Sequence, residues 1–146
     1  MAKYRFELGL KEDYPIIVAG STHPGEEKVL FESFKCIRKK YPHARLIIAP
    51  RKTARADEIA KLASHYGYET GFRSKMLEKS GERKEYPLLI IDTIGELGRI
   101  YAVGDVVFVG GSFSNTGGHN VLELLPMPNR FSSARACRTL RIPMHC

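Results

Sequence analysis

The sequence predicts an α/β fold with a Rossmann-like parallel sheet and flanking helices. Short apolar runs alternate with helical patterns along the chain, which is the order expected of parallel β/α units. Glycine-rich or polar segments follow several of the apolar runs, and in open α/β sheets ligands bind beyond the carboxyl ends of the strands. The 146 residues are enough for one domain with a substantial core. We therefore expect a single sheet with a ligand site at one edge.

The first two β/α units have the clearest patterns. Residues 16–19 read Ile-Ile-Val-Ala, a buried strand, and the amphipathic pattern of residues 25–40 predicts the helix that follows. Residues 46–49 form the second predicted strand. Residues 54–66 form the second predicted helix, which Gly67 ends because glycine readily adopts the left-handed conformation found there.

The remaining predicted elements are shorter. Residues 68–72 are a weaker third strand, and the charged stretch 75–85 is expected to be a solvated loop. Residues 88–91 predict the fourth strand, 95–102 a short helix, and 106–109 the fifth strand.

Composition and charge narrow the class of protein. The net charge is +7, but residues 124–146 contain four arginines and no acid, whereas the first 123 residues carry 19 basic and 16 acidic side chains. The body of the chain is therefore not a nucleic-acid-binding surface on charge alone, and no nucleic-acid partner is expected. No apolar run approaches the ~20 residues of a membrane span. Neither the three cysteines nor the five histidines have metal-ligand spacing, so no metal is expected, and without a Walker motif or a GxGxxG after the first strand no cofactor is expected either. The three cysteines make no even framework, so a cytoplasmic location fits best.

The most informative segment is VVFVGGSFSNTGGHNVLE, at residues 106–123. Glycines after a strand let the backbone approach a ligand closely, and a helix N-terminus offers N–H groups and partial positive charge to a phosphate. Glu123 would lie one turn into the following helix, where a carboxylate could bind the two hydroxyls of a ribose. The candidate binding residues in this segment are Gly111, Ser112, Gly118, His119, Asn120 and Glu123.

Other candidates follow the first, second and fourth strands. Ser21 and Thr22 could hold a phosphate or a sugar acid, and capping of the next helix is an equally good interpretation of both residues. Arg51, after the second strand, could pair with a phosphate or lie against a pyrimidine ring. Asp92 and Thr93, after the fourth strand, could simply cap the next helix.

The glycine segment also resembles a known family. GGSFSNTGGHNVLE is similar to the sugar-nucleotide loop of the bacterial 3-deoxy-D-manno-octulosonic acid (Kdo) transferases, which are GT-B glycosyltransferases. Three further segments agree in the same order: VAGSTHPGEE, IIAPRKTAR and IDTIGELGRIYAVGDVVFVGGS. The likeness extends from about Pro15 to Glu123, and four ordered motifs are more specific than any single glycine pattern.

The resemblance implies a function and adds site residues. Members of the family transfer Kdo from CMP-Kdo to lipid A precursors at the cytoplasmic face of the inner membrane. Pro50 and Arg51 match the family's Ala-Pro-Arg motif, whereas Lys52 stands where the family commonly has histidine. By the same resemblance Gly95 and Glu96 border the nucleotide. The family's membrane anchor and its acceptor-binding domain, which carries the catalytic base, have no counterpart here, so no catalytic residue is assigned.

The resemblance ends at Glu123. Residues 1–123 are interpreted as a partial C-terminal nucleotide-sugar-binding domain of a GT-B enzyme whose last strand is lost. Residues 124–146 lack the family pattern. With permissible codons, one base inserted after the first base of the Leu124 codon restores EPAAYAKPVLFGPCMQNF, which resembles the family closely. We therefore expect the tail to be a frameshift product, natural or introduced in sequencing.

Three alternatives to a CMP-Kdo-binding domain remain open at this level. A GT-B domain for a UDP-sugar would share the glycine segment and the ribose carboxylate. A basic module could bind RNA or anionic lipid through the arginines of residues 124–146. The chain could also be a nonfunctional gene fragment.

Overall fold

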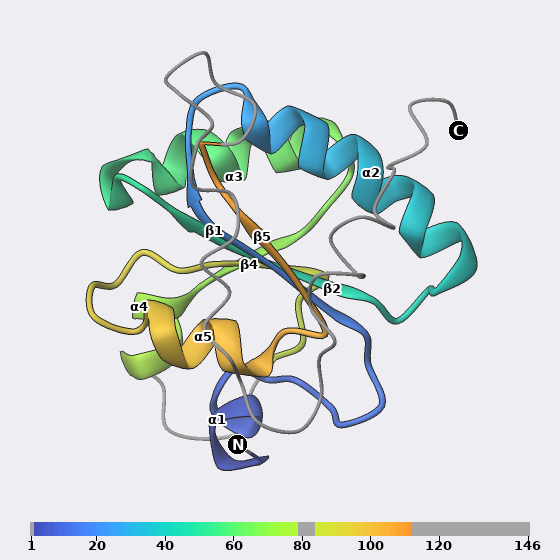
Figure 1. Cartoon of the computed structure of the whole chain (residues 1–146), viewed down its shortest axis with the longest axis vertical. Coiled ribbons are helices and arrows are strands. Elements are labelled where there is room, and N and C mark those ends of the chain that lie inside the picture. Colours follow the sequence, from blue (N-terminus) through green and yellow to red (C-terminus); the bar gives the residue numbers. More distant parts are fainter. Residues whose placement is uncertain (1, 79–83, 112–146) are drawn as a thin grey trace.

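The computed structural model of this chain describes residues 2–78 and 84–111 (Figure 1). Within them a single five-stranded sheet has the order β3-β4-β2-β1-β5, and every neighbouring pair is parallel. The strands are β1 (Ile16–Thr22), β2 (Arg45–Pro50), β3 (Thr70–Phe72), β4 (Leu88–Ile90) and β5 (Val106–Val109). The predicted α/β class with a parallel sheet is confirmed.

The helices cover both faces of the sheet. They are α1 (Ala2–Glu7), α2 (Glu26–Lys40), the 3₁₀ turn η1 (Thr53–Arg55), α3 (Ala56–His65), α4 (Arg73–Glu78) and α5 (Leu97–Val103). Figure 1 shows α2 and α3 on one face and α1, α4 and α5 on the other. The arrangement is the three-layer architecture that buries a parallel sheet on both sides.

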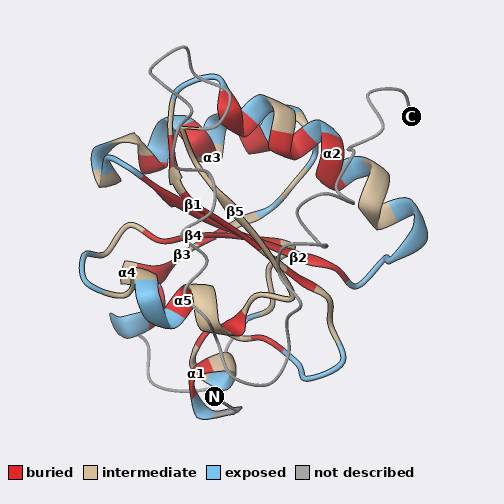
Figure 2. Ribbon diagram, viewed as in Figure 1, coloured by how far each residue is buried: buried red, intermediate tan, exposed pale blue. Residues whose placement is uncertain are grey.

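Two apolar clusters, one on each face, hold these layers together (Figure 2). Successive side chains of a strand point to opposite faces, so Val18 packs in the cluster with Ile100 of α5, whereas Ala19 packs with Phe31 and Phe34 of α2. The inner strands are almost continuously apolar because both of their faces are covered. This pattern explains why β1, β2 and β4 could be predicted from their sequence.

The charged stretch 75–85 was expected to be a solvated loop, and its first part is not. Residues 75–78 belong to helix α4, and Met76 is buried in the cluster beneath α1 and α5. The prediction was wrong because single-turn charged helices owe their stability to tertiary packing, which periodicity does not report. Helix α1 was not predicted at all, yet Tyr4 and the following Leu8 are buried in the same cluster.

Strand β5 stands at the margin of the sheet formed by residues 2–78 and 84–111. The predicted loss of the next strand and the predicted frameshift concern residues after Gly111, which lie outside the described part of the chain. Both remain predictions. No helix among the described residues is long and apolar enough to span a bilayer.

Candidate functional site

The carboxyl ends of β1, β2 and β5 lie side by side at one edge of the sheet. The backbone N–H of Arg51 donates to the carbonyl of Thr22 at 3.1 Å, so the residue after β2 is fixed beside the end of β1. On the other side, the N–H of Gly110 donates to the carbonyl of Gly20 at 2.7 Å. Three residues predicted from the sequence therefore lie at the same edge of the sheet: Ser21 in β1, Arg51 after β2 and Gly111 after β5.

Strand β1 ends in an irregularity centred on Ser21. The register with β2 shifts between Gly20 and Thr22, and Ser21 has a φ of 53°, the left-handed region that non-glycine residues rarely adopt. The Tyr101 ring of α5 lies against Gly20, where an added Cβ would come within 2.1 Å of the phenolic oxygen. Burial raises the pKa of Tyr101, and a hydrogen bond from Ser21 acts in the opposite direction. Backbone strain of this kind is found at functional sites.

The hydroxyl of Thr22 is used inside the protein rather than presented to a ligand. Thr22 is fully buried, and its Oγ1 donates to Oε1 of Glu27 at 3.0 Å. The same carboxylate accepts from Arg55 at 2.8 Å, and this hydrogen bond raises the pKa of the guanidinium. Helix α2 begins after Gly25 without a side-chain cap, so the capping interpretation of Ser21 and Thr22 was wrong.

Glu26 links the β1–α2 loop to the end of β5. Its Oε1 accepts the backbone N–H of Gly111 at 2.7 Å, and its Oε2 accepts the N–H of His23 at 3.2 Å. The side chain is buried, and the residue is only 3% exposed. The sequence did not indicate this role of Glu26, since nothing in its spacing reports a contact with a residue 85 positions away.

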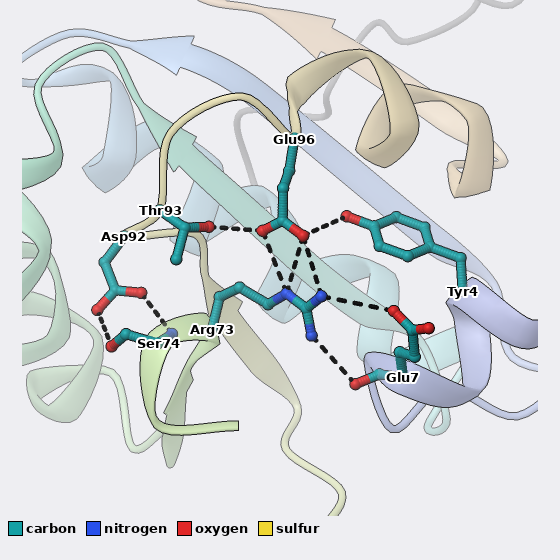
Figure 3. Close-up of polar contacts among 7 residues, drawn as sticks. All are labelled: Tyr4, Glu7, Arg73, Ser74, Asp92, Thr93 and Glu96. Atoms are coloured by element: carbon teal, nitrogen blue, oxygen red, sulfur yellow. Dashed lines mark hydrogen bonds and ion pairs between the residues drawn. The ribbon is translucent and has the colours of Figure 1, made fainter. Parts of the chain in front are cut away.

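A second polar cluster follows the carboxyl ends of β3 and β4 (Figure 3). Arg73, 2% exposed, donates from Nη2 to Oε1 of Glu96 at 2.9 Å and also pairs with the carboxylate of Glu7 at 3.6 Å. Thr93 and Tyr4 donate their hydroxyls to the same Glu96 carboxylate. The hydrogen bond from Arg73 is the main cause that holds the pKa of Glu96 below its ordinary value. Burial raises the pKa of Tyr4 to about 12.

The β4–α5 loop is held at both ends by these contacts. Asp92 accepts hydrogen bonds from the N–H of Ser74 at 2.8 Å and from its hydroxyl at 2.5 Å, while Glu96 is engaged by Arg73. Helix α5 has no side-chain cap, so the capping interpretation of Asp92 and Thr93 was wrong. Gly95, at φ 90°, gives the loop its turn at the same edge of the sheet as Arg51.

Five of the twelve predicted site residues lie beyond the described part of the chain. Those positions are Ser112, Gly118, His119, Asn120 and Glu123. Across residues 2–78 and 84–111, no group of three or more histidine, cysteine or acidic side chains could hold a metal ion.

This chain has relatives of similar sequence among known proteins. No protein-family model matches the chain. The 3-deoxy-D-manno-octulosonic acid transferase of Aquifex aeolicus is 38% identical over 115 residues, which are 79% of this chain and 30% of that protein. The Haemophilus influenzae enzyme of the same name is 36% identical over 79% of this chain and 26% of its own length. The chain therefore spans less than a third of either relative.

A solved structure extends the likeness to the fold. The C-terminal CMP-Kdo binding domain of WaaA from Acinetobacter baumannii superposes with a TM-score of 0.68 at 30% identity, covering 83% of this chain and 61% of that one. The five-stranded parallel sheet with flanking helices is thus the fold of a nucleotide-sugar-binding half of a GT-B enzyme.

Proposed function

Because this chain is homologous to the 3-deoxy-D-manno-octulosonic acid transferases in sequence and to their CMP-Kdo-binding domain in fold, we propose that it binds CMP-Kdo. The observation that carries the proposal is the meeting of Arg51, the β1 bulge at Ser21 and Gly111 at one edge of the sheet. A nucleotide sugar is anionic, and this edge carries the cation of Arg51, polar backbone groups, and the glycine at which the chain leaves β5.

Each part of the edge has a role in this proposal. Arg51 pairs with the phosphate, and the backbone at Gly110 and Gly111 approaches the nucleotide closely because these two residues carry no side chain. Gly95 and Glu96 shape the border of the same site by backbone, since the carboxylate of Glu96 is held by Arg73. Among the residues after Gly111, Glu123 binds the ribose hydroxyls.

The wider activity belongs to the same proposal. A full-length enzyme containing this domain would transfer Kdo to a lipid A precursor at the cytoplasmic face of the inner membrane, with the catalytic base and the acceptor site on another domain. This domain would hold the nucleotide and stabilise the leaving phosphate through Arg51 and the helix N-termini at this edge. We accordingly expect no Kdo transfer from the purified chain, and detectable transfer would contradict this division of labour.

Titration of the purified chain with CMP, and separately with UDP, tests the proposal by isothermal calorimetry. CMP should bind and UDP should bind more weakly. Arg51→Ala should weaken CMP binding at least about tenfold, because a charge-assisted contact to phosphate is lost. Lys35→Ala, an exposed cation on α2, is the matched control and should leave the affinity unchanged.

Other outcomes of the titrations would favour the alternative functions or exclude Arg51 from the site. Preference for UDP would favour a UDP-sugar domain, and the absence of binding to either nucleotide would favour a nonfunctional fragment. Equal affinity in the wild type and Arg51→Ala would remove Arg51 from the site. A basic module that binds RNA or anionic lipid would lose that binding when residues 124–146 are deleted.

A further inference from the structure

Two consecutive buried carboxylates begin helix α2, and they are neutralised in different ways. Glu27 pairs with Arg55 and accepts from the hydroxyl of Thr22, so its contacts stay among β1, α2 and η1. Glu26 accepts two backbone N–H groups, from His23 and Gly111. Of these two carboxylates, Glu26 is the one that hydrogen-bonds to the end of β5. A carboxylate that bridges two backbone donors fixes their relative positions, because charge-assisted hydrogen bonds are short and directional.

The place where Glu26 binds is the point at which the chain leaves the sheet. The N–H of Gly110 is fixed to β1, and an added Cβ on Gly110 would lie 2.1 Å from the carbonyl oxygen of Ser21, so β5 ends in contact with the β1 bulge. Gly111 then turns at φ 94°, a conformation that favours glycine. With the hydrogen bond to Glu26, the position and direction of the chain at Gly111 are determined.

We propose that Glu26 is a positioning residue of the nucleotide-sugar site, which fixes the exit of the glycine-rich segment from β5 by accepting the N–H of Gly111. The role depends on the reach of the side chain, not only on its charge. It therefore differs from the general preference for an acid in the first turn of a helix, which any carboxylate at this position would satisfy. The inference rests on the proposed nucleotide binding, since the exit it fixes is that of the proposed site.

Two substitutions of Glu26 test separately the length and the charge of its side chain. Glu26→Gln keeps the length but replaces one acceptor oxygen with a donor, and Glu26→Asp keeps the charge but shortens the arm. Both should accelerate hydrogen exchange of the Gly111 N–H at least about tenfold while exchange in the core strands, at Ile48 and Ile90, stays unchanged. Both should also weaken CMP binding about three- to tenfold.

The matched control is Glu12→Gln, which makes the same charge change at an exposed position between α1 and β1. It should alter neither Gly111 exchange nor CMP affinity. Full protection of Gly111 in Glu26→Asp would show that charge alone suffices and would overturn the proposal. So would equal acceleration at Ile48 and Ile90, because Glu26 would then serve only global stability.

A measurement on the wild type keeps the proposal testable if both variants fail to fold. A scalar coupling across the hydrogen bond between the Gly111 nitrogen and the Glu26 carboxyl carbon should be detectable by NMR, and its absence would overturn the proposal. Failure of the proposed function has a different signature. In that case the wild type does not bind CMP, while the exchange of Gly111 still reports whether Glu26 fixes this exit.

Discussion

Two buried ion-pair clusters lie at the carboxyl edge of the sheet, one toward each face. The Glu27 cluster (Thr22, Glu27 and Arg55) lies with α2 and α3, and the Glu96 cluster (Tyr4, Arg73, Thr93 and Glu96) lies with α1, α4 and α5. Arg55 is 14% exposed at its side chain and Arg73 only 2%. The two clusters therefore have the same chemistry but differ in how fully the cation is removed from water.

They also differ in what they connect. In the Glu27 cluster the partners are 5 and 28 positions apart, within the first two β/α units. In the Glu96 cluster Tyr4 and Glu96 are 92 positions apart, and Arg73 also donates to the carbonyl of Glu7 in the N-terminal helix. The Glu27 cluster connects the first two β/α units to each other, whereas the Glu96 cluster holds α1 against the face of the sheet. The difference shows that the segment before β1 is an integral part of this fold.

The largest expected effect comes from Arg73→Ala. It leaves the Glu96 carboxylate largely buried without its cation and frees α1, so it should lower the free energy of unfolding by about 3–5 kcal/mol. Chemical denaturation measures the change, and Lys61→Ala, an exposed cation on α3, should change stability by less than about 0.5 kcal/mol. A loss below about 1 kcal/mol for Arg73→Ala would mean that water replaces the guanidinium and that the cluster is not truly buried.

Arg55→Ala should cost less, about 2–3 kcal/mol, because the Arg55 side chain is 14% exposed, so water can partly replace its guanidinium, and because its loss does not release α1. The same denaturation experiment checks it. If the loss equals or exceeds that of Arg73→Ala, the tie to α1 adds nothing to stability and the contrast between the two clusters is wrong.

The contrast between the faces also explains what the sequence could predict. Helices α2 and α3 have regular apolar stripes, with Leu30 and Phe34 on one and Ile59 and Ala63 on the other, so periodicity identified both. The opposite face depends on α1 and α4, each of six residues, and on a buried arginine. No local pattern distinguishes Arg73 from a surface cation, because its burial depends on partners in two other segments, α1 and the loop between β4 and α5.

The candidate site was predictable to a similar degree. The rule that ligands bind at the carboxyl ends of parallel strands grouped Ser21, Arg51 and Gly111, and the structure puts their backbones at one edge. It could not show that Thr22 points inward to Glu27, since strand polarity and bulges decide which side chains face a ligand. Nor could it indicate Glu26, whose contact with Gly111 exists only once β5 lies beside β1.

Tyr4→Phe should have the smallest effect and the most specific signature. It removes one hydroxyl that donates to Glu96 at 3.4 Å and leaves the ring in place, so near neutral pH it should cost only about 0.5–1 kcal/mol.

Tyr4 has its pKa raised from 10.0 to about 12, chiefly by burial, so between these values the folded state binds more protons than the unfolded state. The contribution of Tyr4 is thus complete below pH 10 and is lost as the pH rises through 12, whereas phenylalanine has no proton to lose. The difference in unfolding free energy between wild type and Tyr4→Phe should therefore shrink and then change sign across this range. A difference that stays constant would show that Tyr4 titrates at its ordinary pKa and that α1 is not packed against the Glu96 cluster.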